Sequence, residues 1–368
     1  MTTVNIRELA ERAKASGALD LAQGVIQVPP PAVLTDLFKK LPVSEISRYN
    51  NKRGVPEYRA AIAKYLARRG WEVPVENIAG TAGAMAGITS SLLQHCSPGA
   101  KVLLPEPFFQ GHAQLLKSLG LEPVHVKTPY GEPIDWGSLA AHFPDVEAAI
   151  ITTPSNPTGH VATHEQLETL ITAGQEHNCF LIIDEMYREF VWDESKHDDS
   201  DHQNLDLSLA AVVRSFSKTL SIPGWRAGWI ITSPELMEAI STVHDPIFAG
   251  GSTLAQNALA QALDKHDDEL TVYVNELRDL CLTNAAAMLE AFAKIDMVGE
   301  MPAATYYLLL KHNRASDMEA FEELLKLGLV VTPGNAFFSD QSAETGYVRV
   351  HAGISTESRE RVITALQG

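Results

Sequence analysis

Residues 211–232 read AVVRSFSKTLSIPGWRAGWIIT, two apolar runs separated by a loop that carries one lysine. The runs at 211–215 and 227–232 are apolar nearly throughout, which is typical of strands covered on both faces of a parallel sheet. Lys218 lies between them among Phe, Leu, Ile, Pro and Trp residues. The stretch therefore predicts two interior strands joined by a loop that holds a lysine in an apolar setting.

Similar runs alternate with helical patterns upstream of this stretch. Thr163 and Gln166 form a capping box at the start of one helix, and Ser233-Pro234 opens another. This repetition implies an α/β fold, with a mostly parallel sheet flanked by helices. Further strands are predicted at 101–104, 123–126, 148–152 and 179–184.

The pattern changes beyond about residue 255. A long helical pattern at 255–294, with a break near 266–268, precedes a strand at 303–311. A helix opened by Ser316, short strands around Val330 and Val348 and a final helix follow. We expect a smaller α+β domain here.

The expected organisation has three parts. Residues 46–265 form a large domain, and residues 266–368 form the small C-terminal domain. Residues 1–45 form an N-terminal arm that joins the small domain, and its first 15 residues predict an amphipathic helix rather than a targeting segment.

Composition and charge narrow the function classes. Apolar residues make up 45% of the 368, as in ordinary globular proteins. Acidic residues outnumber basic ones by 46 to 29, and the net charge of −17 opposes binding to nucleic acid or to anionic membranes. The three cysteines are too few and too scattered for a disulfide framework, so we expect a cytoplasmic protein.

Two segments resemble, at first sight, parts of a membrane protein and of a metal-binding protein. Residues 77–100 contain no Asp, Glu, Lys or Arg, but their serines, threonines and glycines indicate a buried helix rather than a membrane span. Residues 193–204, DESKHDDSDHQN, are acidic and histidine-rich without ligand spacing. We expect a solvated loop there and no metal site.

Chemically useful side chains follow the predicted strands. An apolar setting lowers the pKa of a lysine, which makes Lys218 a nucleophile toward carbonyl groups, and Arg226 suits a phosphate. Asp184 ends the run at 179–184, and ligands bind at that end of strands in open α/β sheets. Tyr187 follows three residues later, although each of these residues alone would be read as a surface group or a helix cap.

Two turns add hydrogen-bonding groups. Asn156 lies in the turn PSNPTG that follows the run at 148–152. Gly83 belongs to a small-residue turn at 80–85 that leads into a helix, whose free N–H groups suit an anion, although such a turn also serves packing alone. An amine, an acid, a phosphate cradle and neutral hydrogen-bonding groups are together what pyridoxal 5′-phosphate requires.

These residues stand in motifs that resemble the class I/II aminotransferases, which are fold type I pyridoxal-phosphate enzymes. The resemblance covers nearly the whole chain. SFSKT at 215–219 with GWRAG at 224–228 is similar to the family's Schiff-base lysine and phosphate-arginine signature. The other matching segments are NPTG at 156–159, DEMY at 184–187, YNNKRG at 49–54, PEPFF at 105–109 and GYVRV at 346–350.

The resemblance implies a role for each matched residue. Lys218 joins the cofactor aldehyde and moves a proton at the substrate, and Asp184 pairs with the ring nitrogen. Asn156 and Tyr187 bind the phenolate oxygen, and Phe109 stacks on the ring. The residues expected at the phosphate are Ser215, Arg226, Gly83, Ala84, Met85 and Tyr49.

The resemblance also implies substrate contacts and a partner. Arg349 grips the substrate carboxylate, and Gly24, Asn156 and His112 lie beside the substrate. Because the family's tyrosine reaches the neighbouring subunit's phosphate, Tyr49 implies a homodimer. The loop QGVIQVPPP at 23–31 keeps Gly24 but lacks the family's usual Pro, Asp and Phe. His351 shares the strand face of Arg349 and is a further neighbour of the substrate to consider.

The implied reaction is ping-pong transfer of an α-amino group from an L-amino acid to a 2-oxo acid. The same residues would serve a β- or γ-elimination, a cyclisation or an oxidative deamination, and the altered loop keeps these alternatives open. A regulatory protein of the same fold is disfavoured, because the roughly 20 residues before Leu21 leave no space for a DNA-binding domain and the chain is acidic.

Overall fold

The computed structural model describes residues 5–128, 130–131, 134–193 and 199–367. Its centre is a seven-stranded sheet in the order β2-β8-β7-β6-β5-β3-β4, in which β8 runs opposite to the other six strands. The mostly parallel α/β sheet predicted from the sequence is confirmed. The strands are β2 (Ile78–Thr81), β3 (Lys101–Glu106), β4 (Glu122–Lys127), β5 (Ala148–Thr152), β6 (Phe180–Asp184), β7 (Ala210–Ser215) and β8 (Gly228–Ile231).

Neighbouring residues of the central strands face opposite sides of the sheet. Ile150 and Ile182 belong to one apolar core, whereas Ile151 and Ile183 belong to the other. Both faces are therefore covered, which explains why these strands are apolar throughout. The first core includes residues of α5 (Ala84–His95), α6 (Gln110–Ser118) and α10 (Pro234–Phe248), and the second those of α4 (Pro56–Ala67), α8 (His164–His177) and α11 (Thr253–Lys265).

The strand β2 was not predicted. Gly80 and Thr81 belong to this strand, so the predicted turn at 80–85 is shorter than expected and α5 begins at Ala84. Four residues that include a glycine carry too little apolar periodicity to mark a strand. α5 lies in the stretch without charges, and no helix of the described residues is long and apolar enough to cross a membrane.

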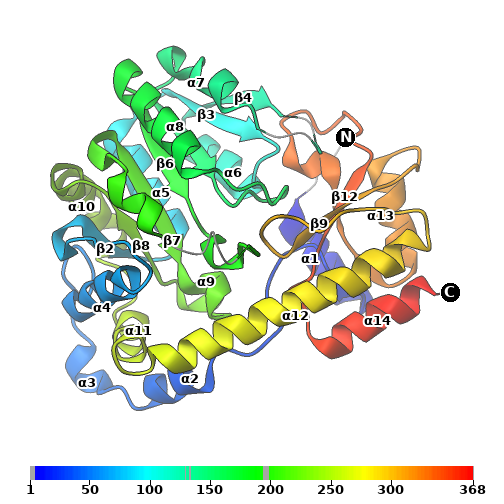
Figure 1. The fold of residues 1–368 in the computed structure, drawn as a ribbon, viewed down its shortest axis with the longest axis horizontal. Coiled ribbons are helices and arrows are strands. Elements are labelled where there is room, and N and C mark those ends of the chain that lie inside the picture. Colours follow the sequence, from blue (N-terminus) through cyan, green and yellow to red (C-terminus); the bar gives the residue numbers. More distant parts are fainter. Residues whose placement is uncertain (1–4, 129, 132–133, 194–198, 368) are drawn as a thin grey trace.

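A long helix, α12 (Asp267–Ala293), leads from the central sheet to a smaller α+β region (Figure 1). The break before it falls at His266, as predicted. In this region β11, β12 and β9 form an antiparallel sheet. Its elements are β9 (Tyr307–Lys311), α13 (Asp317–Lys326), β10 (Leu329–Val330), β11 (Thr332–Pro333), β12 (Tyr347–His351) and α14 (Thr356–Leu366).

The N-terminal arm packs on this smaller region. Leu9 and Ala13 of α1 (Ile6–Ser16) share an apolar core with Val348 and Val350, and β1 (Leu19–Asp20) pairs with β10. The grouping of the arm with the C-terminal part agrees with this packing, whereas the domain boundaries stay a prediction. The remaining helices are α2 (Ala32–Lys39), α3 (Val43–Ile46), α7 (Trp136–Ala140) and α9 (Phe216–Thr219).

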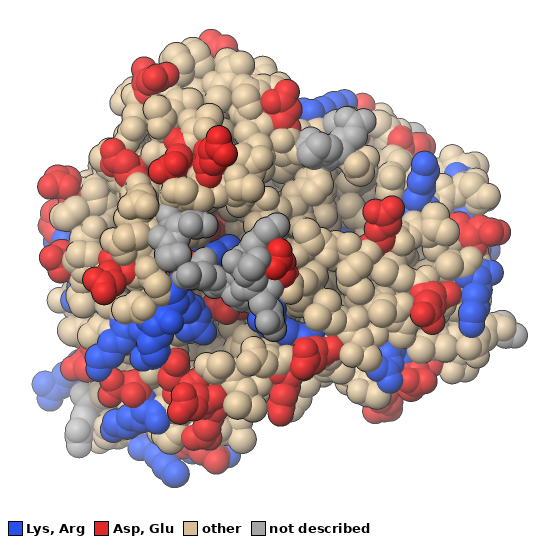
Figure 2. All heavy atoms as spheres, in the orientation of Figure 1, with Lys and Arg blue, Asp and Glu red and all other residues tan. Residues whose placement is uncertain are grey.

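A buried ion-pair cluster contradicts the expected solvated loop at Asp199 and His202, whereas Asp193, Gln203 and Asn204 of the same segment are exposed. Asp199 accepts a 2.6 Å bond from Arg214 Nη1, and His202 Nε2 lies 2.7 Å from Glu185 Oε1. All four side chains are buried, because Arg214 supplies the charge that makes burial of the acids possible. Residues 194–198 of this segment lie outside the described part of the chain. Elsewhere, acidic and basic side chains are interspersed over the face shown in Figure 2.

Candidate active site

A cavity of about 470 Å³ opens where the central strands end. The carboxyl ends of β5 and β6 are level, because Thr152 pairs with Asp184 across the sheet, and β7 lies next to β6. The loops after these strands bring Asn156, Asp184 and Lys218 to the cavity, although they are far apart in sequence. Its other lining residues are Asn5, Ile6, Gln23, Val25, Ala84, Met85, Phe109, Gln110, Gly111, Gln114, Thr152, Met186, Tyr187, Ser217, Pro223, Arg226 and Tyr307.

Lys218 lies on the single turn α9 directly after β7. Its Nζ donates a 2.9 Å hydrogen bond to the carbonyl oxygen of Gly24. Burial lowers the pKa of this amine, and the positive charges of Arg349 and Arg226 lower it further, against an opposing effect of Tyr307. The amine thus loses its proton at lower pH than an exposed lysine does, as the sequence predicted for an apolar setting.

Gly24 is the close neighbour of this lysine. Its φ of +65° lies in the left-handed region, and a Cβ at this position would come within 2.2 Å of Tyr307 Oη. Its carbonyl oxygen also accepts a 3.1 Å hydrogen bond from Tyr306 Oη. Only glycine therefore fits, and the arm is fixed against the lysine by its backbone.

Asp184 faces the cavity from the end of β6. Its Oδ1 accepts a 3.2 Å bond from the backbone N–H of Met186, and its Oδ2 lies 3.1 Å from His112 Nε2. His112 is fully buried and meets the ring of Phe109 edge-on, with centroids 5.4 Å apart. His112 therefore supports Asp184 from behind and is not among the lining residues, whereas Phe109 is.

An anion cradle lies at the start of α5. Gly83 precedes the helix with φ +83°, and the first N–H groups of α5 have no side-chain cap. A Cβ on Gly83 would come within 2.7 Å of Arg226 Nη2, so the arginine lies directly against this turn. Arg226 is exposed, donates a 3.1 Å bond to Pro223 O, and forms no ion pair with a described carboxylate. Ala84, Met85 and Arg226 together thus offer donors to an anion.

A chain of hydrogen-bonded polar side chains forms another wall of the cavity. Arg349 Nη1 donates to Asn156 Oδ1 at 2.8 Å, and Asn156 Nδ2 lies 3.5 Å from Tyr187 Oη. Tyr187 Oη in turn bonds Tyr307 Oη at 2.9 Å. Arg349 is fully buried, and its guanidinium also bonds Ala22 O and lies 4.2 Å from the ring centroid of Tyr307. Asn156 and Tyr187 are thereby brought together with Arg349, which stands just behind the lining.

Three residues that the sequence places near the site do not line the cavity in this chain, although Ser215 Oγ lies 2.8 Å from the Oγ of Ser217, which does. The hydroxyl of Ser215 donates to Ala227 O at 2.7 Å, and Ser217 rather than Ser215 lines the cavity. Tyr49 is 97% exposed and does not line the cavity of its own chain. His351 is buried with Nε2 3.3 Å from Asp20 O, and burial lowers its pKa to about 3, so it stays neutral and apart from the cavity.

The sequence did not point to Tyr307 or Ser217. Tyr307 reads as one more apolar residue of a strand pattern, and only the pairing of β9 with β12 brings it beside Arg349. Ser217 stands two residues after Ser215, and spacing alone does not tell which hydroxyl faces the cavity. Gln110 and Gln114, which also line the cavity, belong to no motif.

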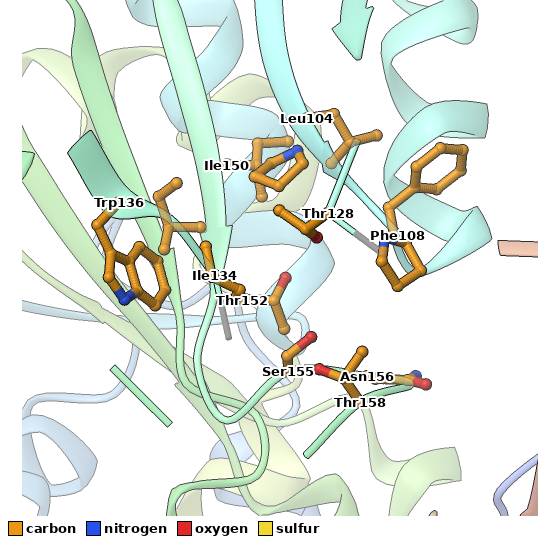
Figure 3. Close-up of a pocket in the computed structure, with 13 residues that line it drawn as sticks. Leu104, Phe108, Thr128, Ile134, Trp136, Ile150, Thr152, Ser155, Asn156 and Thr158 are labelled. Carbon is orange, nitrogen blue, oxygen red and sulfur yellow. The ribbon is translucent and has the colours of Figure 1, made fainter. Parts of the chain in front are cut away.

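Thr152 and Asn156 also border a second, much smaller cavity (Figure 3). Its volume of about 30 Å³ suits a water molecule rather than a cofactor. Among the described residues no group of three or more His, Cys, Asp or Glu side chains is arranged to hold a metal ion. The cavity of about 470 Å³ is the candidate site for chemistry, because Lys218, Asp184 and Asn156 line it.

Comparison with known proteins agrees with this geometry. The aspartate aminotransferase of Pyrococcus horikoshii is 27% identical over 99% of this chain and 94% of its own length. The structure of N-succinyldiaminopimelate aminotransferase from Mycobacterium tuberculosis superposes with a TM-score of 0.88 at 25% identity, over 99% of this chain and 96% of that one. An Escherichia coli protein with a methionine aminotransferase function superposes with a TM-score of 0.89 at 22% identity, over 100% and 97% of the two chains, which shows a shared fold. The family model of aminotransferase class I and II matches residues 15–366, and the chain therefore belongs to this family.

Proposed function

We propose that the cavity at the ends of β5, β6 and β7 is the active site of this aminotransferase and that Lys218 is its catalytic amine. The observation that carries this proposal is the position of Lys218 Nζ, a half-buried amine of lowered pKa in the cavity that Asp184 also lines. A lysine in such a setting is suited to carbonyl chemistry.

The residues of the cavity fit pyridoxal 5′-phosphate, the cofactor of this family. The turn at Gly83 has room for an anion only because glycine has no Cβ. Arg226 lies against this turn, and no described carboxylate pairs with it, so its positive charge is available to the anion. Lys218 would accept the aldehyde, Asp184 the protonated ring nitrogen, and Phe109 the face of the ring. Asn156 and Tyr187 are placed to bind the phenolate oxygen.

The proposed roles follow from the chemistry of each side chain. When bound, the cofactor supplies an electron sink for the bonds to the substrate's α-carbon. The Nζ of Lys218, neutral at lower pH than an ordinary lysine, would take the proton from the substrate's α-carbon and deliver it to the cofactor. Asp184 is oriented by the N–H of Met186 and by His112. Its negative charge would keep the ring nitrogen of the cofactor protonated.

The substrate carboxylate is assigned to Arg349. A guanidinium binds a carboxylate through two parallel hydrogen bonds, and Arg349 already holds Asn156, which lines the cavity. The buried position of Arg349 strengthens such a pairing, because less water competes for its donors.

We further propose a cytoplasmic homodimer. Tyr49 is almost fully exposed in the single chain, which is unusual for a large aromatic residue and fits the expected contact with a neighbour's phosphate. The free thiols of Cys96, Cys179 and Cys281 suit a reducing compartment.

A half-reaction tests transamination against its alternatives. Adding an amino acid to the protein loaded with pyridoxal phosphate, without a 2-oxo acid, is expected to convert the cofactor to its amine form, followed by absorbance. Release of ammonia while the aldehyde form persists would instead support elimination or oxidative deamination. Lys64→Ala, on an exposed helix face, is a control that should behave as wild type.

A further inference from the structure

The groups that line the active-site cavity differ in charge between two sets. The strand-end set contains the charged groups Lys218, Asp184 and Arg226. The arm set comes from the N-terminal arm and α6, and consists of Asn5, Ile6, Gln23, Val25, Gln110, Gly111 and Gln114. Every polar side chain of the arm set is a neutral carboxamide. Among the described lining residues, Lys218 and Arg226 are the sole cations.

One amide of the arm set is committed to holding the wall together. Gln110 is buried, its Oε1 accepts a 3.2 Å bond from the backbone N–H of Ile6, and its Nε2 donates to Ala336 O at 2.8 Å. Ile6 itself is buried, and Val25 is half-buried. The deeper part of this wall is therefore apolar and rigidly hydrogen-bonded.

Two other amides remain available to a ligand. The side chains of Gln23 and Gln114 form no hydrogen bond with another described residue, and both are exposed while lining the cavity, which places them at its opening. A carboxamide both donates and accepts hydrogen bonds, so it can replace the hydrogen bonds that an uncharged polar group makes with water. Neither amide can neutralise a charge.

From this lining we infer that the amino donor carries an uncharged side chain, either apolar or amide-bearing like those of methionine and glutamine, and not a side-chain carboxylate. The inference rests on the proposed function, in which Lys218 and Arg226 serve the cofactor and Arg349 the α-carboxylate. A second carboxylate beside Ile6 and Val25 would lose hydration without gaining a cation from the described lining of this chain. Methylene groups would gain from the same contact.

The inference distinguishes this chain from several of its relatives. The similar protein of Pyrococcus horikoshii is named an aspartate aminotransferase. Recognition of a dicarboxylate requires an arginine or lysine at the far end of the substrate. Gln114, one turn beyond Gln110 on α6, is a neutral group at the opening where such a cation would act, so it is the proposed specificity-determining residue.

Binding of unreactive analogues tests the inference without turnover. α-Methyl-L-methionine and α-methyl-L-aspartate lack the α-hydrogen, so each should bind to the loaded protein and stay unchanged. We expect the methionine analogue to bind at least about tenfold more tightly, by calorimetric titration. Equal binding, or tighter binding of the aspartate analogue, would overturn the inference. If Arg48→Gln then abolished that binding, a cation beside Tyr49 would be the group that recognises the carboxylate.

A charge-introducing variant supplies the matched test. Gln114→Arg should reduce the preference for the methionine analogue by roughly tenfold, because the new guanidinium pairs with the aspartate carboxylate. Gln367→Arg adds the same charge at the exposed end of α14, outside the lining, and should leave the preference unchanged. An unchanged preference in Gln114→Arg would remove Gln114 from this role. If no amino acid converts the cofactor in the half-reaction, the proposed function fails, and the inference fails with it.

Discussion

Asp184 and Glu185 are consecutive residues with opposite surroundings. Both oxygens of Glu185 are engaged, one 2.7 Å from Arg214 and the other 2.7 Å from His202. Although burial opposes its ionisation, Arg214 and His202 hold the pKa of Glu185 at about 2. Asp184 lines the cavity instead, and no described lysine or arginine forms an ion pair with it.

The same difference separates the cavity from the ion-pair cluster as a whole. Asp199, Glu185 and Arg214 pair with one another inside the protein, so none of them is left as an unpaired buried charge. Lys218 donates a hydrogen bond to the backbone carbonyl of Gly24, and Arg226 donates one to that of Pro223. Neither forms an ion pair with a described carboxylate, so both charges are available to a ligand. Incomplete pairing of buried or crowded charges is therefore the physical mark of the active site, whereas complete pairing marks a structural role.

The largest expected effect comes from the cavity member of the acidic pair. Asp184→Asn should lower kcat/KM by about 10²–10³-fold, because a neutral amide no longer holds a positive charge on the cofactor ring. The free energy of unfolding of the cofactor-free protein should change little. Steady-state kinetics and urea unfolding check both points, and near-normal turnover would remove Asp184 from its proposed role.

The structural member of the pair should show the reverse. Glu185→Gln removes one of the two carboxylates that pair with the buried Arg214 and leaves Asp199 as the other. It should destabilise the protein by about 2 kcal/mol, with kcat nearly unchanged well below the unfolding temperature. Urea unfolding and kinetics on the same sample measure both. A rate loss as large as that of Asp184→Asn would show that the two residues are not functionally distinct.

A smaller effect should be visible at Lys218 without any cofactor. Burial lowers the pKa of Lys218 in the folded protein. Between this lowered pKa and the ordinary pKa of lysine, the unfolded chain binds more protons than the folded protein, so stability rises with pH. At lower pH the lysine is charged in both states, and its charge lowers the free energy of unfolding by the full amount. Lys218→Met should therefore raise the melting temperature of the cofactor-free protein at neutral pH. The gain should shrink as pH rises toward about 10.4. A gain that is independent of pH would show that the amine is not buried as a charge.

The sequence predicts the centre of the molecule well because burial on both faces leaves a strong apolar signal. The run at Ala148–Thr152 and the motifs after it placed Asn156, Asp184 and Lys218 at one edge of the sheet. The prediction that Asp199 and His202 are solvated is wrong, because their partners Arg214 and Glu185 lie in other segments and local composition does not reveal them.

Sequence patterns also do not predict features that depend on how distant segments of the chain pack together. β2 is too short to show a period, and it is recognised only by its pairing with β8. Tyr307 becomes a cavity residue through the fold of the smaller region, and Gln114 through the position of α6. These residues carry ordinary side chains, so only their place in space distinguishes them.

Borohydride reduction of the protein loaded with pyridoxal phosphate tests the central claim most directly. After proteolysis and mass spectrometry, we predict that the reduced cofactor is attached to the peptide that contains Lys218, and that Lys218→Ala carries no label. A cofactor trapped on another lysine, or no covalent label in the wild type, would contradict the assignment of this cavity as the active site.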